Sequence, residues 1–135
     1  MPKKTTVSFM SKLLIVDDST DLLEAMELIL AQKGYVVKTL RDSKNVNDQI
    51  EAFNPDLLIL DIFLAGRDGR DICKELRKII ENKYLCIIIF SASPKALEDY
   101  QSYGADDFLE KPFGINNLIE KIEKVLNSCK AKAEN

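Results

Sequence analysis

The stretch Leu13-Leu14-Ile15-Val16-Asp17-Asp18 (residues 13–18) is a continuous apolar run that ends in two acids. A short strand that is apolar at every position is typical of a strand buried on both faces, as in a parallel sheet covered by helices. The same pattern returns at Leu57-Leu58-Ile59-Leu60, which is followed by Asp61. We therefore expect two central parallel strands, each of which ends in a carboxylate.

Amphipathic segments separate short apolar runs along the rest of the chain. Further strands are predicted at 35–40, 85–90 and 107–110, and helices at 21–33, around 46–53, at about 70–80, at 93–104 and at about 115–126. Strict alternation of strand and helix favours a parallel sheet, because parallel neighbours require a crossover of helical length. The expected fold class is α/β: a doubly wound, flavodoxin-like, five-stranded parallel sheet, for which 2-1-3-4-5 is the natural strand order.

Length and composition indicate one ordinary globular domain. The chain has 135 residues, of which 46% are hydrophobic and 30% charged, and this is enough to build a core without metal or disulfide support. We assign residues 12–128 to the domain, 1–11 to a disordered N-terminal arm and 129–135 to a polar C-terminal tail. No apolar run approaches the roughly 18 residues of a membrane span and no signal-type segment begins the chain, so we expect a cytoplasmic protein without membrane contact.

Charge and cysteine content exclude further classes. The formal net charge of −3 argues against direct DNA binding through charge alone. The chain has three cysteines, an odd number, and they show no CxxC spacing. Neither a zinc site nor a disulfide framework is therefore indicated. Cys73 and Cys86 fall inside apolar segments, where we expect small buried thiols.

The chain contains no histidine. This excludes His-based acid–base catalysis, Ser-His-Asp and Cys-His nucleophile systems, and imidazole metal sites. Any chemistry must therefore rest on carboxylates.

Polar side chains gather at the predicted carboxyl ends of the strands, where open α/β sheets bind their ligands. They are Asp17, Asp18, Asp61, Ser91 and Lys111. Each alone has an ordinary structural explanation, such as a helix-terminal acid or a turn residue. Together they suggest a site, because like charges about 4 Å apart repel by about 4 kcal/mol at an effective dielectric constant near 20. Mg²⁺ would relieve this repulsion, and Lys111 and Ser91 suit a phosphoryl group on Asp61, the candidate nucleophile.

These residues, with Asp68-Gly69 and Lys111-Pro112-Phe113, occur in an order that resembles the receiver domain of bacterial two-component response regulators. The resemblance covers about residues 12–127. It implies phosphorelay signalling rather than enzymatic turnover of a substrate. Asp61 would take a phosphoryl group from a histidine kinase or a histidine phosphotransfer protein, and the surface formed by 93–104, 107–110 and the last helix would then contact a downstream protein target.

The resemblance also implies roles for individual residues. Asp18, Asp61 and the backbone carbonyl of Phe63 would ligate Mg²⁺, and Asp17 would act mainly through a bound water. Ser91 would hydrogen-bond a phosphoryl oxygen on switching, and Lys111 would pair with the phosphoryl group. Lys111-Pro112 would be a cis peptide. Phe108 lies at the position of the switch aromatic. A half-buried strand residue is the simpler interpretation, but we favour the switch role.

Several positions depart from the family pattern. Leu64-Ala65 replaces the usual Met-Pro after the acceptor, so the loop loses a proline constraint, and Gly66 is expected to loosen it further. Phe63 is a bulky aromatic two residues past the acceptor, and we hypothesise that it slows hydrolysis of the aspartyl phosphate by crowding the attacking water. The short segment from Ser91 to Lys111 predicts a small helix. Its Tyr100 and Tyr103 are candidates for partner contacts or, equally, for core packing.

Other functions fit less well. An Asp-nucleophile, Mg²⁺-dependent phosphatase of the haloacid dehalogenase type would need a second acid where Phe63 stands. A flavodoxin-like FMN carrier would not present Asp17-Asp18 to a phosphate, and a purely structural domain would need neither the acids nor Lys111. The chain ends favour a stand-alone (CheY-like) receiver over a receiver fragment of a longer response regulator or hybrid histidine kinase. Because the chain has no histidine, the phosphodonor must be another molecule.

Overall fold

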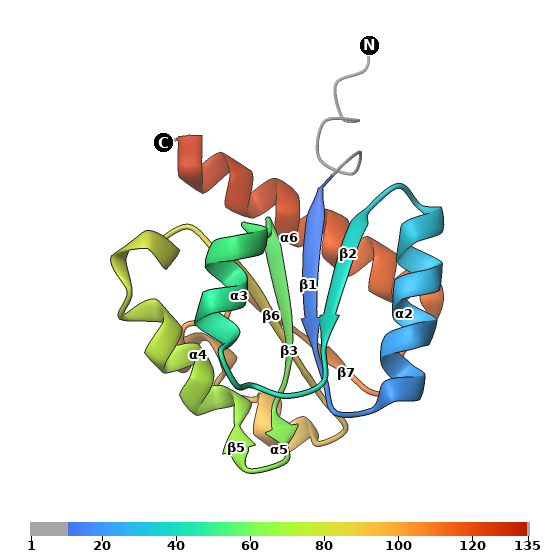
Figure 1. The fold of residues 1–135 in the computed structure, drawn as a ribbon, viewed down its shortest axis with the longest axis horizontal. Coiled ribbons are helices and arrows are strands. Elements are labelled where there is room, and N and C mark those ends of the chain that lie inside the picture. Colours follow the sequence, from blue (N-terminus) through green and yellow to red (C-terminus); the bar gives the residue numbers. More distant parts are fainter. Residues whose placement is uncertain (1–10, 135) are drawn as a thin grey trace.

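The structure, a computed structural model, describes residues 11–134 (Figure 1). Five parallel strands form the central sheet in the order β2-β1-β3-β6-β7, which confirms the predicted order. Their bounds are β1 (Lys12–Val16), β2 (Val36–Leu40), β3 (Leu57–Asp61), β6 (Cys86–Ser91) and β7 (Asp107–Glu110). The strand direction brings all five carboxyl ends to the lower edge of the sheet in Figure 1.

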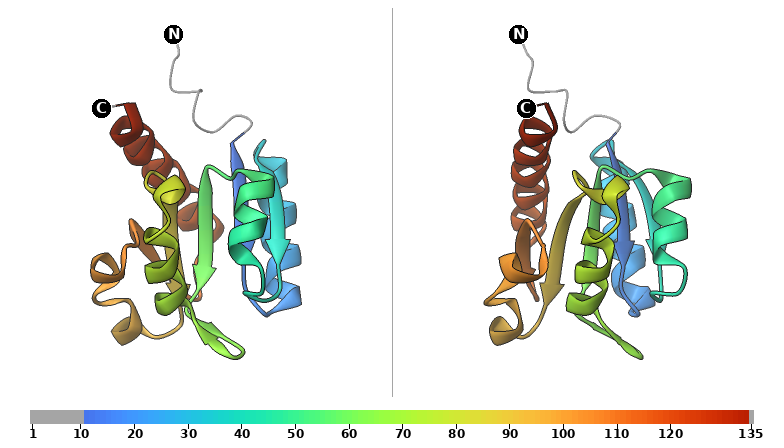
Figure 2. Two further views of the ribbon diagram at one scale, coloured as in Figure 1. Left: turned by 60° about the vertical axis from the view of Figure 1, so that its left-hand side comes forward. Right: turned by 90° about the vertical axis from the view of Figure 1, so that its left-hand side faces the viewer.

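Helices cover both faces of the sheet, which gives three layers (Figure 2). The helices are α2 (Thr20–Gln32), α3 (Val46–Phe53), α4 (Gly69–Arg77), α5 (Pro94–Leu97) and α6 (Ile115–Glu134), with single 3-10 turns η1 (Ile80–Asn82) and η2 (Tyr100–Tyr103). Residues of α2 and α6 pack on one face of the sheet, and residues of α3, α4 and α5 pack on the other. None of these described helices is long and apolar enough to cross a membrane.

The apolar runs divide their side chains between the two layers. In β1, Leu13 and Ile15 face α2 and α6, while Leu14 and Val16 face α3 and α4. All four are 0% exposed. Burial on both faces explains why the strand is apolar at every position, as the opening motif predicts.

Two of the connections follow from their capping residues. Ser19 caps α2, and its hydroxyl accepts a hydrogen bond from the Leu22 N–H at 3.3 Å. Ser93 caps α5 in the same way through the Ala96 N–H at 3.2 Å. Gly104 ends η2 with a φ of 98°, a conformation that glycine adopts without steric cost.

Two predicted helices are shorter than the apolar spacing suggests. The helix expected to reach residue 80 ends at Arg77, where the buried Asn82 amide donates a hydrogen bond to the Leu76 carbonyl oxygen at 3.1 Å. Ile80, whose apolar side chain is the reason for extending the predicted helix to residue 80, lies outside α4 and is 80% exposed, so that extension is wrong. The helix predicted over 93–104 divides into α5 and η2.

A short hairpin, which the sequence did not predict, follows β3. β4 (Phe63–Leu64) pairs antiparallel with β5 (Arg67–Asp68), and Gly66 forms the turn with a φ of 81°. The expectation of a looser loop is therefore wrong. A two-residue turn with a positive φ at glycine closes a hairpin without help from proline.

The end of the chain also differs from the prediction. Residues 129–134, predicted as part of a polar tail, are the last residues of α6. Cys129 is only 8% exposed and forms a disulfide with Cys86, so the expectation of a free thiol at Cys86 is wrong. Cys73 is a free buried cysteine, as predicted. The disordered arm predicted for 1–11 lies outside the described residues except for Ser11, whose carbonyl oxygen accepts a hydrogen bond from the Val36 N–H.

Candidate functional site

The predicted polar residues meet at the carboxyl edge of the sheet. Asp17 and Asp18 follow β1, Asp61 ends β3, Ser91 ends β6 and Lys111 follows β7. One carboxylate oxygen from each of the three acids lies within 4.8 Å of the others. The clustering that the strand order predicts is therefore present in the structure.

Lys111 reaches across the edge to two of the acids. Its Nζ lies 2.8 Å from Asp17 Oδ2 and 3.5 Å from Asp61 Oδ1. The ammonium also lies 4.6 Å from the centre of the Phe90 ring, a favourable cation–π position. The Lys111–Pro112 peptide is cis, as predicted.

The two acids after β1 have different partners. Asp17 is 1% exposed, and its Oδ1 accepts a hydrogen bond from the Ser19 N–H at 2.8 Å while Oδ2 faces Lys111. Asp18 is exposed, and its Oδ2 accepts a hydrogen bond from the Ala65 N–H at 3.2 Å. Asp18 therefore links the hairpin to the acidic cluster through a hydrogen bond that no sequence pattern predicts.

Asp61 is buried, with 5% of its surface exposed. Burial and the neighbouring Asp17 raise the pKa of Asp61 to about 6, and Lys111 and a hydrogen bond from the Phe63 backbone oppose that rise. The ionised form of Asp61 is thus held in an environment that disfavours it. A further positive charge nearby would stabilise the ionised form of Asp61.

The donor set fits a hard divalent cation. With three ionised carboxylates and one ammonium, the cluster carries a charge of −3 + 1 = −2. Mg²⁺ prefers oxygen ligands and is usually held by one or two carboxylates with several waters. Asp17, Asp18 and Asp61 are the residues that would hold it, and the part assigned to the Phe63 carbonyl remains a prediction.

Ser91 and Phe108 occupy the neighbouring strands. Ser91 is 1% exposed, and its Oγ accepts a hydrogen bond from the Ser93 N–H at 3.1 Å. Phe108 is partly buried, with its ring 5.1 Å from that of Tyr100 and 4.9 Å from Lys121 Nζ. This packing agrees with the simpler interpretation of Phe108 as a half-buried strand residue, and its switch role stays a prediction.

The tyrosines of the short segment are packed rather than free. Tyr103 is 5% exposed, and its hydroxyl donates a hydrogen bond to the Ala96 carbonyl oxygen at 3.1 Å. Tyr100 packs against the same core layer. Of the two explanations that the sequence left open, core packing is the one that the structure supports.

Gly69 allows α4 to lie close to the end of β3, a role that its place in the sequence did not predict. Its N–H donates a hydrogen bond to the Ile62 carbonyl oxygen at 2.7 Å, and α4 begins directly against the backbone that follows β3. A Cβ at this position would overlap the Asp61 carbonyl oxygen and lie 2.9 Å from Ile62 Cα. The glycine after Asp68 is therefore a requirement of close backbone approach.

The fold and this edge together define a class: a doubly wound domain that gathers three acids and one lysine at the carboxyl ends of its strands. The chain belongs to the response regulator receiver domain family, whose family model matches residues 13–123. It is thus a receiver domain of two-component signalling, as the sequence resemblance implies.

Solved structures agree with this assignment. A protein of Chloroflexus aurantiacus J-10-fl named as a response regulator is 33% identical, with 87% of this chain and 98% of that chain covered and a TM-score of 0.81. A CheY-like receiver domain protein from Methanospirillum hungatei JF-1 is 26% identical, with 91% and 98% covered and a TM-score of 0.82. NtrX from Brucella abortus is 30% identical with a TM-score of 0.84, and the match covers 93% of this chain but only 29% of NtrX.

The close approach at Gly69 predicts a large effect of one methyl group. Gly69→Ala should lower the free energy of unfolding by about 1–3 kcal/mol, because the new Cβ forces the backbone at Asp61 and Ile62 to move. Gly114→Ala is the matched control, since no atom lies within 4 Å of a Cβ there. Urea denaturation of both variants measures the difference, and equal stabilities would contradict the proposed contact.

The raised pKa of Asp61 predicts that Asp61→Asn stabilises the fold by an amount that depends on pH. Without metal at pH 7.5, Asp61→Asn should raise the free energy of unfolding by about 1–3 kcal/mol, because the variant removes a buried charge that disfavours the folded state. The pKa of Asp61 is about 6 in the folded state and 3.8 ordinarily, so wild type gains stability as pH falls through that window. The advantage of Asp61→Asn should therefore vanish below about pH 4. Urea denaturation in EDTA across this range, with the exposed Asp48→Asn as control, tests the sign.

Proposed function

We propose that Asp61 is the phosphoacceptor of a Mg²⁺-dependent phosphorelay. The observation that carries the proposal is a buried carboxylate beside an ammonium: Asp61 is 5% exposed, and its Oδ1 lies 3.5 Å from Lys111 Nζ. A buried anion with a raised pKa is a poor structural choice unless the site binds further positive charge. Membership of the receiver family supports the same role.

The chemistry follows from the positions of these side chains. A carboxylate oxygen of Asp61 attacks phosphorus, an O–P bond forms, and the P–N bond of a donor phosphohistidine breaks as the imidazole nitrogen keeps the electron pair. Asp17, Asp18, Asp61 and the Phe63 carbonyl would hold Mg²⁺, which would supply positive charge to offset the negative charge of the transferred phosphoryl oxygens. Asp17 contributes mainly through a bound water. Lys111 pairs with the phosphoryl group, and its contact with Asp17 weakens as it does so.

The switch would begin at Ser91 and pass to Phe108. On phosphorylation the Ser91 hydroxyl leaves the Ser93 N–H and donates to a phosphoryl oxygen. Phe108, which now contacts Tyr100 and Lys121, would then change its side-chain rotamer and alter these contacts. The surface formed by α5, β7 and α6 would change with it and contact a downstream protein.

The donor must come from outside the chain. These 135 residues contain no histidine, so no phosphohistidine within them can supply Asp61. We propose that a histidine kinase or a histidine phosphotransfer protein serves this role in the cytoplasm. The domain would assist only its own phosphorylation and dephosphorylation.

A small phosphodonor tests the acceptor directly. With acetyl phosphate and Mg²⁺, intact mass should show one added phosphoryl group that hydroxylamine removes, since an acyl phosphate reacts with that nucleophile. Asp61→Asn should carry no adduct, whereas the exposed Asp48→Asn should be modified like wild type. An adduct that persists in Asp61→Asn, or that resists hydroxylamine, would overturn the assignment.

Phe63 should control how long the phosphoryl group lasts. Its side chain is 55% exposed beside the Arg70 guanidinium, whose carbon lies 5.9 Å from the ring centre, and its backbone hydrogen-bonds Asp61. Phe63→Asn should speed hydrolysis by about three- to tenfold, because a small polar group lets water approach, and this corresponds to about 0.7–1.4 kcal/mol of barrier. The decay of the adduct after donor removal measures the rate, and an unchanged lifetime would reject the hypothesis.

A further inference from the structure

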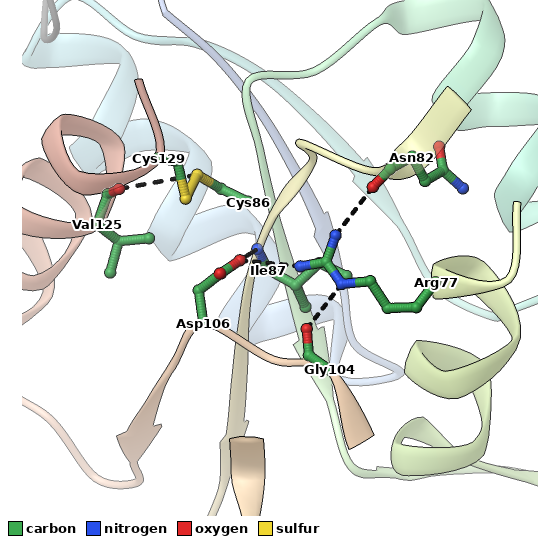
Figure 3. Close-up of a disulfide and its surroundings, with 8 residues drawn as sticks. All are labelled: Arg77, Asn82, Cys86, Ile87, Gly104, Asp106, Val125 and Cys129. Carbon is green, nitrogen blue, oxygen red and sulfur yellow. Dashed lines mark hydrogen bonds and ion pairs between the residues drawn. A yellow bond between two sulfur atoms is a disulfide. The ribbon is translucent and has the colours of Figure 1, made fainter. Parts of the chain in front are cut away.

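A disulfide joins the amino end of β6 to the last turns of α6 (Figure 3). Cys86 is the first residue of β6, and Cys129 lies 43 residues later in the chain, with the two Cα atoms 6.0 Å apart. Ser91, at the opposite end of the same strand, belongs to the candidate phosphorylation site. The disulfide is therefore at the edge of the sheet away from that site and is not part of its chemistry.

The two bonded cysteines are isolated from the third. Cys86 and Cys129 lie in the core layer shared with α2 and α6, whereas Cys73 lies in the layer shared with α3 and α4. Burial raises the pKa of the Cys73 thiol to about 11, which keeps it protonated and unreactive. Exchange among the three cysteines within the folded domain would have to cross the sheet, so the pair acts on its own.

Cys129 is the member of the disulfide that lies next to a cavity. Cys129 lines a cavity of about 180 Å³ together with Arg77, Lys83, Tyr84 and Asp106, and it is 8% exposed, against 1% for Cys86. Arg77 is paired with Asp106, so the charged lining side chains Arg77, Lys83 and Asp106 sum to +2 − 1 = +1, which favours an anionic ligand. Because Cys129 and not Cys86 lines this cavity, Cys129 is the cysteine that we expect an external thiolate to attack.

The surroundings suit both oxidation states of the pair. The Cys86 sulfur lies 3.7 Å from the Val125 carbonyl oxygen, which is placed to accept a hydrogen bond from a Cys86 thiol (Figure 3). Asp106 Oδ2 accepts hydrogen bonds from Arg77 and from the Ile87 N–H, both at 2.9 Å, and these bonds do not involve the sulfurs. Breaking the disulfide thus leaves the neighbouring polar groups paired.

The same neighbourhood is a weaker candidate for a metal. One carboxylate oxygen of Asp106 and the two sulfurs lie within 4.8 Å of one another. The sulfurs, however, are bonded to each other, and the Asp106 carboxylate is paired with Arg77 at 2.9 Å. Thiol chemistry therefore accounts for the group better than metal binding does.

We propose that Cys86 and Cys129 form a reversible thiol–disulfide exchange site for small anionic thiols. A thiolate attacks the Cys129 sulfur, a mixed disulfide forms, and Cys86 leaves as a thiolate that takes a proton from water. A second thiolate attacks the small-molecule sulfur of the mixed disulfide, so that a small disulfide leaves and Cys129 becomes a thiol. The protein gains two electrons and two protons, and two small thiols are oxidised; the small disulfide drives the reverse reaction.

The exchange would change how firmly α6 is held. The disulfide fixes the second half of α6 to the sheet, and the same helix carries Lys121, which lies 3.1 Å from Asp107 and 4.9 Å from the Phe108 ring centre. Reduction removes the covalent link and leaves the last turns held by the packing of residues such as Val125 and Leu126 and by the contact between Cys86 and the Val125 carbonyl oxygen. The oxidation state of the two cysteines would therefore set the mobility of α6 in the surface formed by α5, β7 and α6, independently of phosphorylation.

Equilibration of the full chain with reduced and oxidised glutathione tests the proposal. Alkylation in denaturant followed by intact mass should count one reactive cysteine after oxidation, Cys73, and three after reduction. Reduction of the native protein should lower Tm by about 5–10 °C, because it releases a loop closed over 43 residues. Hydrogen exchange should speed up in the C-terminal half of α6.

Cysteine variants provide the controls. Cys129→Ala should show no glutathione-dependent change in Tm or in hydrogen exchange, and a folded Cys86→Ala should behave like Cys129→Ala. Cys73→Ala should respond as wild type does. Three alkylated cysteines at every glutathione ratio would overturn the proposal. So would a disulfide that glutathione reduces only after unfolding, or a mixed disulfide at Cys129 that never closes, or a Tm shift that persists in Cys129→Ala.

Discussion

Two carboxylates are held almost out of solvent at the ends of adjacent parallel strands, and much of this domain is arranged around that constraint. Asp17 is 1% exposed and Asp61 5%, while Lys111 Nζ lies 2.8 and 3.5 Å from their oxygens. Buried like charges are costly unless further positive charge is near. Because burial and Asp17 together raise the pKa of Asp61 to about 6 even beside Lys111, one lysine does not fully compensate. A bound cation would therefore stabilise this cluster, which is what the proposed phosphoryl transfer requires.

The fold supplies this arrangement from segments that are distant in the chain. Lys111 lies 94 residues after Asp17, and only the order β2-β1-β3-β6-β7 brings the two together. Buried apolar strands carry the acids at their ends, and Gly69 allows α4 to begin against the backbone of Asp61 and Ile62. Asp18 and Ala65 connect the hairpin to the same cluster. The buried carboxylates Asp17 and Asp61, whose burial opposes folding, are therefore among the groups for which we propose a role in phosphoryl transfer.

The sequence predicted the sheet and the clustering of polar side chains at its edge, because both follow from the pattern of apolar residues along the chain and from the parallel direction of the strands. Apolar residues at every position mark β1 and β3, and parallel strands put Asp17, Asp61 and Lys111 at one edge whatever the details of the loops. It did not predict features that depend on single contacts. The β4–β5 hairpin rests on one glycine turn, the end of α4 on the Asn82 amide, and the Cys86–Cys129 disulfide on a tertiary approach between segments 43 residues apart. Spacing of residue types carries no information about such contacts.

Titration of the metal-free protein with Mg²⁺ tests the central claim most directly, because it measures whether the acidic cluster is a cation site before any phosphoryl group is present. Calorimetry should show saturable binding of one ion to wild type, and that binding should be lost or weakened at least about tenfold, or about 1.4 kcal/mol, in Asp18→Asn. Asp21→Asn, three residues further on in the exposed first turn of α2, should bind like wild type. No saturable binding to wild type, or equal affinity in Asp18→Asn, would contradict the account.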